Sequence, residues 1–175
     1  VRRAWMQRYT EWELQSVIAS IVADETIAFS HLVLVADDCI VTQDALDAVL
    51  ALAEDHPVVT GYCRLSDGHP LVNITRQPVM GDEPSPGAYD FYRLDDVLNY
   101  PEPVVPTGFV GFALTCMIRD MWRRFPFGVY GDERNSYASD FHLSRRLRDA
   151  GVPMVAARDG FVVHQKVEWN TRDRT

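Results

Sequence analysis

Residues 31–63 have the sequence HLVLVADDCIVTQDALDAVLALAEDHPVVTGYC, and this stretch decides the expected fold. The uninterrupted apolar run at residues 31–36 is typical of a strand that is buried on both faces. A helix capped by Thr42 follows, with apolar residues at helical spacing, and Pro57 ends it. Residues 58–63 then indicate a second strand. Strand, helix and strand joined by short links form a βαβ unit, which predicts parallel pairing and a right-handed crossover.

Further elements are expected on both sides of this unit. Helical spacing predicts helices at residues 10–29, 119–124 and 139–151. Apolar runs predict strands at residues 70–76, 104–118, 152–156 and 161–164. The polar stretches 77–88 and 128–138 are expected to be loops that could order over a ligand. We therefore expect one α/β domain over residues 1–175, with a mixed, mostly parallel central sheet flanked by helices.

Composition excludes several classes of protein. A chain of 175 residues suits one domain, and its 47% apolar and 24% charged residues are ordinary for a globular protein. The net charge of −8 argues against a nucleic-acid partner. The longest apolar stretch, residues 104–118, is too short and too broken to span a bilayer. Three widely spaced cysteines, Cys39, Cys63 and Cys116, predict buried free thiols in a reducing compartment, hence a cytoplasmic location.

The first chemical signal is Asp37-Asp38, which comes directly after a buried strand. Ligands of open α/β sheets gather outside the carboxyl ends of strands. Two adjacent carboxylates repel each other, and a hard divalent cation would compensate them while leaving positions for phosphate oxygens. An equally good alternative is a pair of solvated acids that cap the following helix.

Asp140 and His164 are the other two signals. Asp140 heads the helical stripe of Leu143 and Leu147, at a helix N-terminus that favours its ionised form, so it is a candidate general base. The commoner role of such an acid is only to stabilise its helix. His164 ends an apolar strand, where it is a candidate metal ligand or a plain surface residue.

The order of these segments resembles the large family-2-like group of glycosyltransferases with the A-type (GT-A) fold. Residues 32–46, LVLVADDCIVTQDAL, look like the strand and acidic motif of that group (aspartate, any residue, aspartate), with Asp38 at its second aspartate and Ala36 at its first. Residues 105–127 look like its acceptor-side segment. Residues 139–151 look like its Glu-Asp helix, with Ser139 in place of the glutamate. Residues 161–164 are similar to the strand that delivers a histidine metal ligand.

The resemblance implies a metal-dependent, inverting glycosyltransferase that moves a sugar from a nucleotide-sugar donor to an acceptor hydroxyl. Manganese or magnesium would be held by Asp38 and His164, with Asp37 assisting the metal or holding the ribose. Lys166 would contact the donor diphosphate, and Asp140 would be the catalytic base. The first βαβ element of the group, which binds the nucleotide base, has no counterpart before Thr10, so the domain is expected to lack it.

The acceptor side is expected at residues 108–112, where glycine permits close backbone approach. The acceptor-binding candidates are Gly108, Gly111, Phe112 and Trp169, and Tyr130 and Tyr137 are further candidates for stacking on a sugar.

Two other functions fit the same residues. A nucleotidyltransferase shares a related sheet and an acidic metal site, but it would show a Gly-rich phosphate-binding segment. A non-catalytic module that binds a sugar or a protein partner is favoured by Ala36 and Ser139, which replace expected acids.

Overall fold

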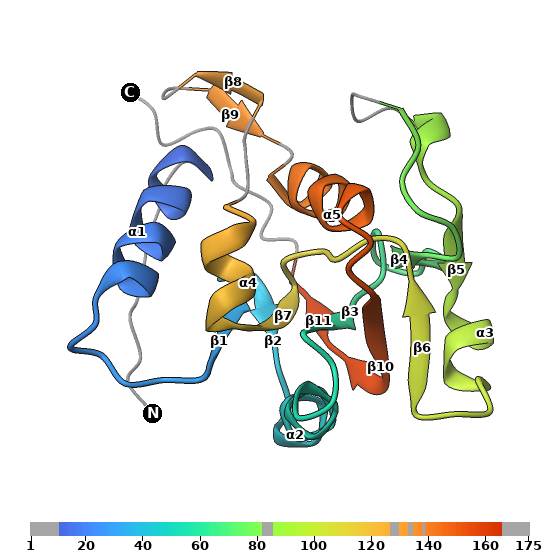
Figure 1. The fold of residues 1–175 in the computed structure, drawn as a ribbon. Helices are drawn as coiled ribbons and strands as arrows, with labels where there is room; N and C mark the ends of the chain where they lie inside the picture. Colours follow the sequence, from blue (N-terminus) through green and yellow to red (C-terminus); the bar gives the residue numbers. More distant parts are fainter. Residues whose placement is uncertain (1–10, 82–85, 127–129, 133–134, 138, 166–175) are drawn as a thin grey trace, which may run out of the picture.

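The structure, a computed structural model, describes residues 11–81, 86–126, 130–132, 135–137 and 139–165 (Figure 1). Within these residues the chain forms an α/β fold with a mixed five-stranded central sheet flanked by helices, as expected. The strands of this sheet lie in the spatial order β1 (His31–Val35), β7 (Leu114–Ile118), β3 (Val58–Tyr62), β10 (Met154–Phe161) and β6 (Val104–Thr107).

The expectation of a mostly parallel sheet is wrong. Among the described strands of the sheet, only β3 and β10 are parallel neighbours, and the other neighbouring pairs are antiparallel. The strands of the expected βαβ unit, β1 and β3, run in the same direction but are not paired, because β7 lies between them. Cys116 of β7 is the register partner of both Val33 and Val59. An apolar run indicates a buried strand but does not specify its neighbours.

Helices cover both faces of the sheet (Figure 1). On one face lie α1 (Glu11–Ala23), α4 (Arg119–Arg124) and α5 (Ser139–Asp149), and on the other lies α2 (Gln43–Ala53). The predicted cap of α2 is confirmed, because the Thr42 hydroxyl accepts a hydrogen bond from the Ala45 amide at 3.2 Å. The helix predicted to reach residue 29 ends earlier, at Ala23. The next residue, Asp24, begins a turn, because its carboxylate accepts hydrogen bonds from the amide and the hydroxyl of Thr26.

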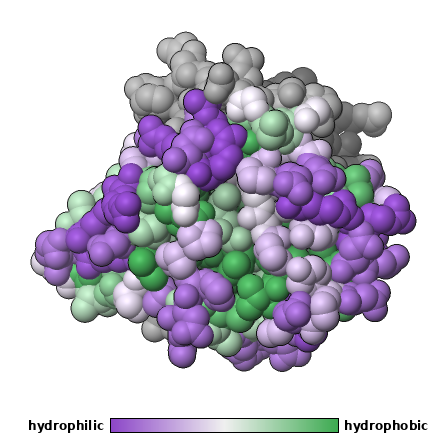
Figure 2. Space-filling model, turned by 45° about the vertical axis from the view of Figure 1, so that its right-hand side comes forward, coloured by the Kyte–Doolittle hydropathy of each residue, from purple (hydrophilic) through white to green (hydrophobic). Residues whose placement is uncertain are grey.

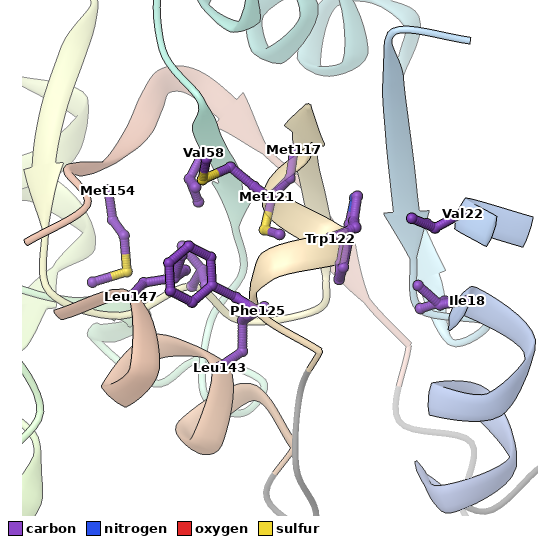
Figure 3. Close-up of a cluster of buried hydrophobic side chains, with 11 residues drawn as sticks. Ile18, Val22, Val58, Met117, Met121, Trp122, Phe125, Leu143, Leu147 and Met154 are labelled. Carbon is purple, nitrogen blue, oxygen red and sulfur yellow. The ribbon is translucent and has the colours of Figure 1, made fainter. Parts of the chain in front are cut away.

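Two apolar layers hold the helices to the sheet. The side chain of Val58 belongs to the layer that contains residues of α1, α4 and α5, and that of the next residue, Val59, belongs to the layer that contains residues of α2. This alternation is the two-residue period of a strand. Figure 3 shows the first layer, in which Trp122 of α4 and Phe125, directly after α4, lie between the residues of α1 and those of α5. Complete burial of each valine contributes about 1.5–3 kcal/mol.

The remaining elements are short. They are β2 (Cys39–Ile40), β4 (Leu71–Thr75), η1 (Pro86–Ala88), β5 (Phe91–Arg93), α3 (Leu94–Leu98), β8 (Tyr130–Asp132), β9 (Asn135–Tyr137) and β11 (Val163–His164). The prediction of a loop at residues 128–138 is wrong in part, because β8 and β9 pair through their backbones despite polar side chains. The strands expected at residues 152–156 and 161–164 are instead β10, which runs through the polar residues 158–160, and β11.

The surface is mixed in character. Figure 2 shows one face on which hydrophilic residues cover most of the rim and hydrophobic residues gather toward the middle and lower part. Ile40 and Val163, which are opposite each other in the β2–β11 ribbon, are among the large apolar side chains that remain exposed. Among the described residues, no helix combines the length and the apolar character needed to cross a bilayer.

Candidate functional site

The candidate site lies at one edge of the central sheet. Strands β1, β3 and β10 run in the same direction, so their carboxyl ends meet at this edge. Ligands of open α/β sheets bind outside such ends. A polar residue follows each strand: Asp38 after β1, Arg64 after β3 and His164 after β10.

A tight turn carries the two aspartates. The Ala36 carbonyl accepts a hydrogen bond from the Cys39 amide at 3.2 Å, which places Asp37 and Asp38 at the centre of the turn. The Ala36 amide donates to the Phe112 carbonyl at 3.1 Å, so the turn is fixed against the segment that precedes β7.

A bulge in β10 carries His164 to this turn. The register of β10 against β3 shifts between Ala156 and Phe161, and a bulge of this kind bends a strand and redirects the residues that follow it. The redirected residues form β11, which pairs with β2 so that His164 is opposite Cys39. The Gln165 amide then donates to the Asp38 carbonyl at 2.7 Å.

This arrangement joins two predicted site residues that are 126 positions apart in the sequence. The Nε2 atom of His164 lies 2.8 Å from Oδ2 of Asp38, within hydrogen-bond distance. Both side chains are partly exposed, 26% for His164 and 43% for Asp38, so a ligand can reach them. The other predicted metal ligand, Asp37, is exposed, and among the described residues no hydrogen bond or ion pair joins it to the other two.

The Asp38–His164 pair fits a divalent cation in part. Its separation of 2.8 Å is close to the roughly 3.0 Å between neighbouring ligand atoms of an octahedral ion with bonds of about 2.1 Å. Within the described ranges, no group of three or more His, Cys, Asp or Glu side chains is placed to hold a metal. A cation here would take two protein ligands and its other ligands from phosphate and water, as magnesium sites beside phosphates do.

The thiol of Cys39 lies beside the pair. The Cys39 sulfur lies 3.8 Å from Oδ1 of Asp38. A hydrogen bond with the Cys63 side chain, together with burial, raises the pKa of Cys39 well above its ordinary value. All three cysteines are free, as predicted, and Cys63 and Cys116 are buried; Cys39 is only partly buried, contrary to the prediction.

Asp140 lies in the first turn of α5, and its side chain is partly buried. Its Oδ1 accepts a hydrogen bond from the Phe141 amide at 2.8 Å, and its carbonyl accepts one from the Ser144 hydroxyl at 2.8 Å. The same hydroxyl accepts a hydrogen bond from the Val110 amide at 2.9 Å. The segment 110–112 therefore connects the start of α5 to the aspartate turn, since Phe112 bonds to Ala36.

The predicted acceptor-side residues differ in their surroundings. A Cβ atom on Gly108 would collide with the backbone of Gln77 and Pro78, and one on Gly111 would collide with the side chain of Asn73. Packing of the chain by itself therefore explains the glycine at position 108, whereas at Gly111 the nearest atom is the amide nitrogen at the end of the Asn73 side chain. Phe112 is partly buried against the apolar layer of α1, α4 and α5.

Several predicted residues lie outside the part of the chain whose side chains the structure describes. Lys166 and Trp169 belong to residues 166–175, and the side chains of Tyr130 and Tyr137 are likewise outside it.

Two residues of the site were not predicted. Arg64 shares a hollow with His164, and its sequence signal is a basic residue directly after the second strand of the expected βαβ unit. Ser144, which bonds to both Val110 and Asp140, has no sequence signal beyond its place on the inner stripe of α5.

Comparison of the sequence with protein-family models and with curated proteins finds no match.

Proposed function

We propose that this chain is a metal-dependent glycosyltransferase domain of the A-type fold, which moves a sugar from a nucleotide-sugar donor to an acceptor hydroxyl with inversion. The observation that supports it is the contact between Asp38 and His164. These residues were predicted as ligands of one metal ion, and they lie 2.8 Å apart at the edge of the sheet where ligands bind.

Asp38 and His164 would hold manganese or magnesium together with the donor diphosphate, and Asp37 would contact the ribose from the exposed side of the turn. When bound, the cation stabilises the negative charge that develops on the departing nucleoside diphosphate. The chain's own residues bind and orient the donor: the ribbon of β2 and β11 fixes the two ligands relative to each other. Lys166 would contact the diphosphate.

Asp140 would be the general base of the reaction. Its place in the first turn of α5 favours the carboxylate form that can take a proton from an acceptor hydroxyl. The hydrogen bonds through Ser144 and Val110 hold this turn against the segment that leads to Phe112, on the expected acceptor side. A fixed base of this kind typically accelerates a reaction by about 10²–10⁴-fold.

The first experiment measures thermal unfolding against a panel of nucleoside diphosphates and nucleotide sugars, with manganese and with chelator. One nucleotide should raise the melting temperature only with manganese, because a ligand that binds the native state alone stabilises it. Asp38→Asn should abolish this shift. The control Asp55→Asn, at an exposed aspartate beyond α2, should retain it. Asp140→Asn should also retain the shift while losing at least about 100-fold in sugar transfer.

A non-catalytic module that binds a sugar or a partner protein is the second candidate. It is favoured by the direct hydrogen bond between Asp38 and His164, which satisfies both side chains without a cation, and by the exposed position of Asp37. This candidate predicts no manganese-dependent nucleotide shift, and it predicts that Asp38→Asn lowers the melting temperature in chelator as much as in manganese.

A further inference from the structure

A hollow of about 280 Å³ opens beside His164, between the ends of β3 and β10. It is lined by Arg64, Asp67, Gly68, Phe161, Val163 and His164. Apart from Arg64 and His164, none of these residues belongs to the site described above. Phe161 and Val163 form an apolar wall, and the polar groups come from Arg64, Asp67 and His164.

The turn that follows β3 fixes Arg64 at the wall of this hollow. The backbone of Arg64 forms a bridge with Val72, and the Leu65 amide donates to the Leu71 carbonyl at 3.1 Å. The Nη1 atom of Arg64 donates to the His69 carbonyl at 2.7 Å. One side of the guanidinium is thereby held, and its remaining N–H groups stay available on a half-buried side chain.

The charge on Arg64 is not matched by a neighbouring acid. Across the described ranges no carboxylate oxygen lies within ion-pair distance of its guanidinium, whereas Arg76, Arg123 and Arg158 each pair with Asp or Glu. Asp67 lines the same hollow but is exposed at the turn. A planar guanidinium with free N–H groups is suited to two-point binding of a phosphate.

We propose that the hollow is a phosphate subsite in which Arg64 binds a phosphate group of the ligand that approaches Asp38 and His164. The phosphate belongs either to the nucleotide or to a phosphorylated acceptor, and that choice alone rests on the proposed function. Asp67, at the mouth of the hollow, opposes the bound negative charge. Removing the charge of Arg64 should therefore weaken phosphate binding, and removing the charge of Asp67 should strengthen it.

The test is a titration of ¹⁵N-labelled protein with inorganic pyrophosphate in chelator, followed through the amide signals of Gly68 and Val163. These signals should shift with saturation. Arg64→Gln should weaken binding about 10-fold or more, which corresponds to the loss of a charge-assisted bond of about 1.5–3 kcal/mol. Asp67→Asn should strengthen binding, and Arg64→Lys should bind between the wild type and Arg64→Gln. The control Arg93→Gln, at an exposed arginine on β5, should match the wild type.

Equal pyrophosphate affinity in the wild type and Arg64→Gln, or an Asp67→Asn variant that binds no tighter, would overturn the subsite. The same variants titrated with nucleoside diphosphates and manganese identify the source of the phosphate. Weaker nucleotide binding in Arg64→Gln assigns it to the donor, and unchanged nucleotide binding assigns it to the acceptor. If pyrophosphate binds in chelator but no nucleotide binds with manganese, the subsite stands and the glycosyltransferase proposal fails.

Discussion

The thiol of Cys116 is fully buried at the centre of β7, between its register partners Val33 and Val59. Burial raises its pKa from an ordinary 9.0 to about 11. Between these two values the unfolded chain loses the proton while the folded chain retains it. The unfolded state then binds fewer protons, so the free energy of unfolding falls as the pH rises from 9 to 11.

A substitution at this residue isolates the effect. Cys116→Ala should be less stable than the wild type at pH 8, because it leaves a small cavity. At pH 10.5 this deficit should shrink by about 2 kcal/mol, since the variant has no thiol to keep protonated. Urea unfolding with a reducing agent at both pH values measures the change. Val59→Ala, a truncation at the cross-strand partner, should show the same deficit at both values. A constant deficit for Cys116→Ala would contradict the assigned cause.

At the scale of elements, two glycines allow neighbouring backbone segments to come close together. Gly61 of β3 faces the bulge in β10, where an added Cβ would lie 2.5 Å from the Gly160 carbonyl oxygen. Gly108, after β6, faces the backbone of Gln77 and Pro78 after β4. The absence of a side chain at Gly61 leaves room for the bulge in β10, after which the chain places His164 beside Asp38. The contact at Gly108 fixes the start of the segment that leads to Phe112.

Gly108→Ala should therefore act on stability rather than on ligand contact. Its Cβ would meet backbone atoms that cannot rotate away, and we expect a loss of about 3 kcal/mol in the free energy of unfolding. Gly87→Ala is the matched control, because an added Cβ there meets nothing within 4 Å. Chemical denaturation of both variants checks this. If Gly108→Ala were as stable as Gly87→Ala, the close packing of this segment would be disproved.

At the scale of the whole molecule, Arg119 of α4 connects the end of α1 to the rest of the fold through hydrogen bonds. Its guanidinium donates to the carbonyls of Val22, Asp24 and Ile27 at 2.6–3.0 Å and stacks on the ring of Phe29. Helix α1 has no basic residue in its last turn. Arg119, from α4, thus supplies the positive charge that the C-terminus of a helix favours.

Arg119→Met should loosen α1 more than the central sheet. Loss of bonds between a charged donor and the carbonyls at the end of α1 and just after it should cost about 2 kcal/mol, which corresponds to roughly 30-fold faster amide exchange in α1. Hydrogen exchange read out by NMR compares α1 with β3 and β10 in one experiment. Arg93→Met, at an exposed arginine, is the control. A uniform acceleration through α1, β3 and β10 would show that α1 does not open separately.

The sequence alone determined most of the local structure of this protein. Helix α4, the Thr42 cap of α2 and the strands β1 and β3 lie where spacing, capping and apolar runs predicted them, because these signals act over a few residues. The same local signals identified Asp38, Asp140 and His164 as candidates, since each stands where a predicted strand ends or a predicted helix begins.

Only the tertiary structure decided which of these residues meet. The insertion of β7 between β1 and β3 and the bulge that redirects β10 are long-range pairings, and no short window of sequence encodes them. The insertion and the bulge bring His164 to Asp38 and place Arg64 beside His164. Contacts between distant segments also place Gly108 against the backbone of Gln77 and Pro78. Local residue patterns fix the conformation of a segment, but the order and register of a sheet depend on contacts between distant segments.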